Sequence, residues 1–181
     1  VFIFHICSII IISILHFVMS NEAAKQKVLI VDDKKENLFA MHTVLEDLNI
    51  DIVEATTGEE ALWLILKNDF ALIILDVQMP LMDGFETAKL IKQNEKTKYI
   101  PIIFVTAISK EDEHVFKGYD SGAVDYILKP FEPKILKSKV NIFLDIDKQK
   151  NLAVKESKDL KEKTLIIEKD RDKFVNILNS M

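Results

Sequence analysis

The sequence predicts an α/β fold, a doubly wound five-stranded parallel sheet built from five consecutive βα units and followed by a long C-terminal helix. Two observations support this prediction. Short runs of β-prone apolar residues alternate with segments whose apolar residues recur at helical spacing. The runs are apolar throughout, which is typical of strands that helices bury on both faces. The connections are short, and parallel strands of this kind are joined by right-handed crossovers.

The five strands are expected where the apolar runs lie, at 27–31, 50–55, 71–75, 102–105 and 123–128. The helices are expected around 38–48 and at 59–68, 85–94 and 110–119, and a last one begins near residue 132. Thr57-Gly58 and Asp83-Gly84 supply turn residues before two helices, and Pro101 opens the fourth strand. The expected packed faces of the helices include Leu66, Leu90 and Ile135, with His42 on or beside the first of them.

The third strand runs into a single carboxylate, Asp76, which is followed by a Met79-Pro80 pair. The residue before a proline avoids the α conformation, so the next helix cannot begin there at once. Asp76 is therefore expected at the carboxyl end of a buried strand, facing a short loop. In open α/β sheets this edge is where ligands bind.

Polar side chains end other strands too: Asp32 and Asp33 follow the first, Thr106 the fourth and Lys129 the fifth. Parallel strands bring these residues, together with Asp76, to one edge. Three neighbouring carboxylates repel one another unless a cation is present, and Mg²⁺ prefers oxygen ligands of this kind. An ammonium group and a hydroxyl suit the oxygens of a transferred phosphoryl group, and a carboxylate can act as its acceptor.

Four motifs at this edge resemble those of the receiver domains of two-component response regulators. They are Val-Asp-Asp at 31–33, Leu-Asp-Val-Gln-Met-Pro-Leu-Met-Asp-Gly at 75–84, Val-Thr-Ala at 105–107 and Gly-Ala-Val-Asp-Tyr-Ile-Leu-Lys-Pro-Phe at 122–131. Each motif alone is weak, but the four occur in receiver order and spacing over residues 27–145. The resemblance implies a CheY-like, flavodoxin-like (βα)5 fold.

The resemblance also implies a role for each matching residue. Asp76 would accept the phosphoryl group from the phosphohistidine of a histidine kinase or a phosphotransfer protein. Asp33, Asp76 and the backbone carbonyl of Gln78 would bind Mg²⁺ directly, and Asp32 would act mostly through water. Lys129 would pair with Asp76 and then with the phosphoryl group.

A conformational switch is implied by the same resemblance. Thr106 would turn toward the phosphoryl group and Tyr126 would fill the space it leaves, which changes the surface of the fourth helix, fifth strand and fifth helix that an output domain or protein reads. The Lys129-Pro130 bond is cis in the family. Gln78 and Ile108 occupy positions that vary among receivers and tune dephosphorylation, so the lifetime of the phosphorylated state is not predicted.

Three parts are expected along the chain: an apolar segment at 1–19, a receiver domain at 25–146 and a helical, coiled-coil-like linker at 147–181. Two interpretations of the first part stay open. Its apolar run barely suffices for a membrane span, with the lysines that follow on the cytoplasmic side. Alternatively, Met19 begins the working protein and the earlier residues lie upstream of it. We expect a cytoplasmic domain in both cases, tethered to a membrane only if the anchor is genuine.

The C-terminal stretch repeats one apolar position every seven residues, at Ile146, Ala153, Leu160, Ile167, Phe174 and Met181. The second seam position of a coiled coil is polar, so a weak homodimer is expected, with a charged, solvated tail as the alternative. Residues 169–178 resemble the run-in to a histidine-kinase dimerisation helix, with Ser180 where that family has its phosphorylated histidine. The chain is then either the front of a truncated hybrid kinase, or of another multidomain regulator, or a receiver whose tail lacks kinase activity.

Composition and motifs argue against several other functions. The net charge of −5 disfavours a general nucleic-acid surface, so no direct nucleic-acid binding is expected. Cys7 is the only cysteine, which excludes a disulfide framework within the chain. A haloacid-dehalogenase-like phosphatase would need a second Asp where Gln78 stands, and a receiver used only for docking would not need the acidic set. We therefore expect self-phosphorylation without independent substrate turnover.

Overall fold

The computed structural model describes residues 25–107 and 125–179. At its centre lies a five-stranded parallel sheet with the strand order β2-β1-β3-β4-β5. The strands are β1 (Gln26–Val31), β2 (Ile50–Ala55), β3 (Leu72–Asp76), β4 (Ile102–Thr106) and β5 (Asp125–Leu128). This order is that of a flavodoxin-like, doubly wound sheet, so the predicted fold class is confirmed. Residues 123–124 of the expected fifth strand lie outside the described residues.

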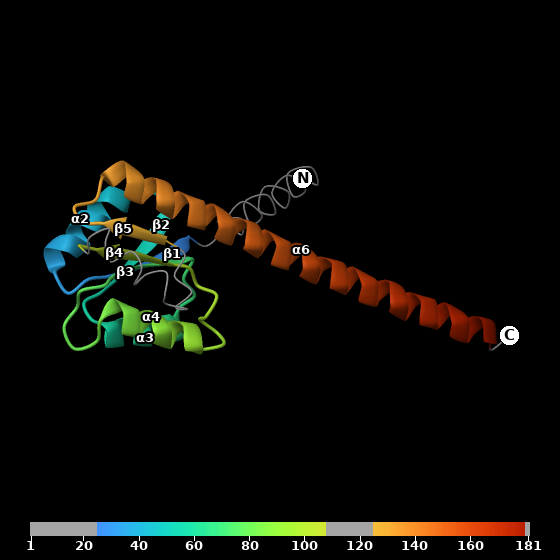
Figure 1. Cartoon of the computed structure of the whole chain (residues 1–181). Coiled ribbons are helices and arrows are strands. Elements are labelled where there is room, and N and C mark those ends of the chain that lie inside the picture. Colours follow the sequence, from blue (N-terminus) through green and yellow to red (C-terminus); the bar gives the residue numbers. More distant parts are fainter. Residues whose placement is uncertain (1–24, 108–124, 180–181) are drawn as a thin grey trace, which may run out of the picture.

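Helices cover both faces of the sheet (Figure 1). They are α2 (Lys35–Leu45), α3 (Gly58–Lys67), α4 (Gly84–Gln93) and α6 (Pro133–Asn179). α2 and the first turns of α6 share one core cluster with Val28 and Ile30 of β1, whereas α3 and α4 share the other with Leu29 and Val31. Successive strand residues point to opposite faces, so a strand covered on both sides must be apolar at every position. The expected helix at 110–119 lies outside the described residues.

Some side chains that were expected on packed helix faces are exposed. Leu66 of α3 is 65% exposed and Leu90 of α4 39%, because the buried stripes of these helices are narrow and centre on small residues such as Ala61 and Ala88. Ile135 is exposed at the start of α6. His42 is also exposed, and its Nδ1 lies 2.6 Å from Oε1 of Glu54 on β2. The prediction of a packed position was therefore wrong for Leu66, Leu90 and Ile135, whereas His42, next to the buried Met41, lies beside the packed face of its helix.

α6 is a single helix of 47 residues, as expected from a stretch without Gly or Pro. Its first turns dock on the sheet through Leu136, Val140, Phe143 and Leu144, which are all buried. Lys137 pairs with Asp47 at 2.8 Å. From residue 148 onward, every α6 side chain that the structure describes is exposed. Within the described residues, no helix is both long and apolar enough to cross a membrane.

Candidate functional site

Three carboxylates meet at the carboxyl edge of the sheet. Asp32 and Asp33 follow β1, and Asp76 ends the neighbouring strand β3. The parallel register pairs Val31 with Leu75, so the residues after them emerge side by side. One oxygen atom of each carboxylate lies within 4.8 Å of the others. Asp32 is fully buried and Asp76 nearly so, which concentrates negative charge where water screens it little.

Lys129 supplies a cation to this cluster. Its Nζ lies 2.8 Å from Oδ2 of Asp32 and 2.8 Å from Oδ1 of Asp76. The backbone amide of Lys129 donates to the carbonyl of Thr106 at 2.7 Å, which aligns the end of β5 with the end of β4. Burial opposes the charge on the ammonium group, but its hydrogen bonds to the two carboxylates outweigh this effect and raise the pKa of Lys129. The Lys129-Pro130 peptide bond is cis, as expected.

Asp32 is held by several donors besides Lys129. Nδ2 of Asn37 lies 2.8 Å from its Oδ1 and 2.9 Å from its Oδ2, and the backbone amide of Lys34 donates to Oδ1 at 2.9 Å. These bonds orient the carboxylate and offset the cost of burying it. The sequence analysis did not single out Asn37. A signal was present, since Asn37 lies five residues after Asp32, in the first turn of the helix that follows the acidic pair.

Asp33 has the opposite environment. Its Oδ1 is buried and has no hydrogen-bond partner among the residues that the structure describes. A buried acceptor of this kind costs on the order of 1–3 kcal/mol unless something binds it. Asp33 belongs to a cluster of three carboxylates to which Lys129 supplies one ammonium group. Mg²⁺ binds carboxylate oxygens and completes its shell with water, so the donor set fits this cation.

The surroundings of Asp76 disfavour the ionised form of its carboxyl group. Burial raises its pKa, and the charges of Asp32 and Asp33 raise it further, while the hydrogen bond from Lys129 acts in the opposite direction. The net shift of the pKa is upward, so positive charge near Asp76 favours its ionised form. A divalent cation among the same carboxylates would supply it.

The loop after β3 folds tightly beneath Asp76. The amide of Gly84 donates to the carbonyl of Val77 at 3.0 Å. A Cβ atom on Gly84 would lie 2.2 Å from the backbone oxygen of Asp76, so only glycine allows α4 to begin here. Leu81, at φ 68°, takes the left-handed conformation in the same loop. Gln78 lies there with an exposed side chain, and its backbone carbonyl remains a predicted ligand.

Thr106 and Tyr126 lie on the strands beyond Asp76. Thr106 ends β4 and is fully buried, one residue after Val105, which pairs with Asp76. Tyr126 pairs with Phe104, so Phe104, Thr106 and Tyr126 share the sheet face that α3 and α4 cover. This common face is where the proposed exchange between Thr106 and Tyr126 would occur. Ile108, and the fourth helix of the expected switch surface, lie outside the described residues.

Comparisons with known proteins bear on the fold and family of the chain. The family described as "Response regulator receiver domain" matches residues 28–141. The transcriptional regulatory protein SrrA of Staphylococcus aureus is 39% identical over 126 residues, which make up 70% of this chain and 48% of that protein. The chain thus spans about half the length of the curated relatives that it matches.

Solved structures show the same fold. The chemotaxis protein CheY4 of Vibrio cholerae has a TM-score of 0.60 and 34% identity, covering 66% of this chain and 99% of that one. The signal receiver domain of a signal transduction histidine kinase from Syntrophus aciditrophicus has a TM-score of 0.61 and 30% identity, covering 66% of this chain and 90% of that one.

Proposed function

The chain belongs to the response regulator receiver family of two-component systems, and on that premise we propose that Asp76 accepts a phosphoryl group from a histidine kinase or a phosphotransfer protein. One observation carries the proposal. The carboxylate of Asp76 lies in a buried acidic cluster with its Oδ1 2.8 Å from the ammonium group of Lys129. A carboxylate nucleophile beside a fixed cation suits phosphoryl transfer, in which positioning and charge stabilisation dominate.

In the proposed transfer, an oxygen of Asp76 forms a bond to phosphorus as the bond from phosphorus to the donor's imidazole nitrogen breaks. The imidazole keeps the electron pair of the broken bond. Lys129 neutralises the carboxylate before transfer and a phosphoryl oxygen after it, and the hydroxyl of Thr106 donates to another oxygen. Bound Mg²⁺ supplies charge neutralisation to the carboxylates and the phosphoryl oxygens.

The proposed metal ligands are Asp33, Asp76 and the backbone carbonyl of Gln78, with Asp32 acting through water. The unequal environments of the two neighbouring aspartates support this division. Asp32 already accepts hydrogen bonds from Asn37, Lys34 and Lys129, whereas Oδ1 of Asp33 lacks a partner among the described residues. A direct bond to the cation therefore suits Asp33 better.

The proposed output is a change in the surface of β5, the first turns of α6 and the helix that the sequence predicts at 110–119. Thr106 and Tyr126 would shift together and favour one of two packings, as a population shift. Tyr126 supports this idea because it shares a sheet face with Thr106 and is only partly buried. An output domain or protein would read the changed surface.

The free part of α6 is proposed to carry the signal onward as a weak homodimer, in a chain divided into a receiver at 25–146 and a linker at 147–181. The exposed Ile146, Leu160 and Ile167, which lie on the seven-residue repeat that also contains Ala153, support this role. The alternative of a truncated hybrid kinase keeps its support from the Syntrophus receiver, which belongs to a histidine kinase. Ser180, which stands where that family has its phosphorylated histidine, lies outside the described residues.

Incubation with Mg²⁺ and acetyl phosphate, followed by intact-mass measurement, tests the proposal. The wild-type chain should gain one phosphoryl group and the variant Asp76→Asn none. Asp69→Asn is the matched control, because Asp69 is exposed at the opposite edge of the sheet, and it should be phosphorylated normally. Phosphorylation of Asp76→Asn, or steady release of phosphate from a small ester, would contradict the proposal; the second result would favour a phosphatase.

A further inference from the structure

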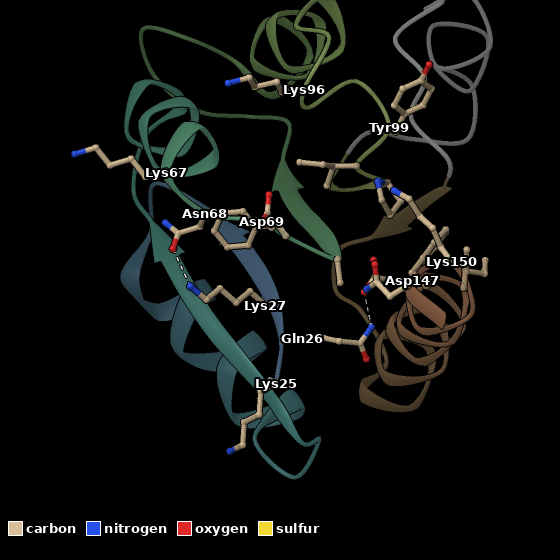
Figure 2. A pocket seen from close by; sticks show the side chains of 17 residues that line it. Lys25, Gln26, Lys27, Lys67, Asn68, Asp69, Lys96, Tyr99, Asp147 and Lys150 are labelled. Carbon is tan, nitrogen blue, oxygen red and sulfur yellow. Dashed lines mark hydrogen bonds between the residues drawn. The ribbon is translucent and has the colours of Figure 1, made fainter. Parts of the chain in front are cut away.

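A second concave site lies at the amino edge of the sheet, opposite the acidic cluster. A cavity of about 690 Å³ opens between the start of β1, the turns that precede β3 and β4, and the part of α6 that leaves the domain (Figure 2). Figure 2 shows Lys27, Asn68 and Asp69 on one side of it and Asp147 and Lys150 of α6 on the other. The volume lies within the range of about 300–1,000 Å³ that is usual for small-molecule sites.

The cavity is strongly basic in an acidic protein. Its lining contains five lysines, Lys25, Lys27, Lys67, Lys96 and Lys150. Against them stand two carboxylates, Asp69 and Asp147, so the formal charge of the lining is +3 while that of the whole chain is −5. The carboxylate of Asp147 already accepts hydrogen bonds from Gln26 at 2.8 Å and from Asn151 at 3.0 Å.

The five lysines have no carboxylate partners of their own among the described residues. Lys27 donates to Oδ1 of Asn68 at 2.8 Å, and the ammonium group of Lys67 lies 3.6 Å from the centre of the Trp63 ring. Lys25, Lys67, Lys96 and Lys150 are exposed. An excess of positive charge around a hollow attracts anions, and lysine binds phosphate oxygens as a mobile point charge.

Apolar surface accompanies this charge. Tyr99 is 71% exposed and Ile146 56%, and both line the cavity, with the buried rings of Phe70 and Phe143 in the wall. An exposed aromatic ring beside a set of ammonium groups can stack on a base while the lysines hold phosphates. The cavity can thus contact both the phosphates and the base of a nucleotide.

We propose that this cavity binds a phosphate ester of nucleotide size, with its phosphates on the lysines and its apolar part against Tyr99. The proposal does not depend on phosphoryl transfer to Asp76. The concave shape, with α6 as one wall, favours a small ligand over a flat surface. A bound ligand would also touch the point at which α6 leaves the domain, where Nε2 of Gln26 donates to the carbonyl of Leu144 at 2.9 Å. A ligand in the cavity would therefore restrict the motion of the free part of α6 relative to the domain.

Trp63 provides a direct readout, because it is the only tryptophan of the chain and Lys67 lies over its ring. The full chain is titrated with ATP in EDTA, followed by Trp63 fluorescence and calorimetry, with inorganic phosphate and adenosine as comparison probes. ATP should bind saturably, more tightly than inorganic phosphate, and adenosine should not bind measurably. Absence of saturable ATP binding, or equal affinity for inorganic phosphate, would overturn the proposal.

Substitutions of the lining lysines test whether ATP binds in this cavity. Lys27→Gln combined with Lys96→Gln should weaken ATP binding by roughly tenfold, because two partly exposed charge contacts are lost. The matched control, Lys89→Gln combined with Lys134→Gln, removes two exposed lysines elsewhere and should bind normally. ATP should also slow hydrogen exchange in residues 143–151. Unchanged affinity in the first double variant, or protection confined to other segments, would show that ATP binds elsewhere.

Discussion

The two edges of the sheet carry charges of opposite sign and differ in how far those charges are buried. At the carboxyl edge, three aspartates share the cation of Lys129 in a largely buried crevice. At the amino edge, five lysines surround an open cavity and remain hydrated. Charge in the crevice must be balanced within the protein or by a bound cation, whereas charge around the cavity is balanced by solvent. Substitutions should therefore have large effects on stability at the first edge and small ones at the second.

The largest expected effect on stability comes from Lys129. Lys129→Gln leaves Asp32 and Asp76 buried without their ammonium group, so it should lower the free energy of unfolding by about 3 kcal/mol in the absence of Mg²⁺. Lys27→Gln is the matched substitution at the other edge. It removes one hydrogen bond to Asn68 and should cost less than about 1 kcal/mol. Denaturant unfolding of both variants measures the difference. Equal losses in the free energy of unfolding would contradict the expected difference between the two edges.

Gly84 should come next. Gly84→Ala forces a Cβ atom against the backbone oxygen of Asp76, which cannot move without displacing β3, so a loss of about 2 kcal/mol is expected. At Gly58 the added Cβ meets side-chain atoms instead of backbone: the flexible side chain of Met82, and Oγ1 of Thr87, which donates to the carbonyl of Asp83 at 2.8 Å. Gly58→Ala should therefore cost less. Thermal unfolding in which the two variants were equally stable would show that the loop beneath Asp76 yields easily.

Of the three substitutions at the carboxyl edge, the one at Asn37 should have the smallest effect on stability. Asn37→Ala removes the side chain that holds both oxygens of the buried Asp32, at an expected cost of about 1.5 kcal/mol. Asn68→Ala removes an acceptor from the partly exposed Lys27 and the 3.1 Å hydrogen bond from Nδ2 to the carbonyl of Leu64. It should cost less because it leaves no buried carboxylate unpaired. Urea titration of the pair tests this order, and the reverse order would mean that Asn37 does not support the acidic cluster.

The sequence was most informative about the carboxyl edge. Asp76, Thr106 and Lys129 each end an apolar run, and parallel strands can bring such ends only to one place. The sequence was less informative about the residues that position these side chains. The hydrogen bond from Asn37 to Asp32 depends on the rotamer of Asn37, and the need for glycine at position 84 depends on how closely α4 approaches β3. Leu66 and Leu90 were misplaced because helical spacing alone does not give the width of a packed stripe.

The amino-edge cavity could not have been predicted. Its lysines come from separate segments of the chain and follow no period, and each one alone is an ordinary surface residue. Only the path of α6 past the turns that precede β3 and β4 brings them around one hollow.

Calorimetric unfolding with and without Mg²⁺ tests the proposed cation site most directly. In the wild type, Mg²⁺ at one hundred times its Kd should stabilise the fold by about 2.7 kcal/mol and raise the Tm. Asp33→Asn should lose this response, and without Mg²⁺ it should be at least as stable as the wild type, because the variant removes a charge that opposes ionisation of Asp76. An equal rise in Tm for both proteins would show that the three carboxylates do not form the cation site on which the account rests.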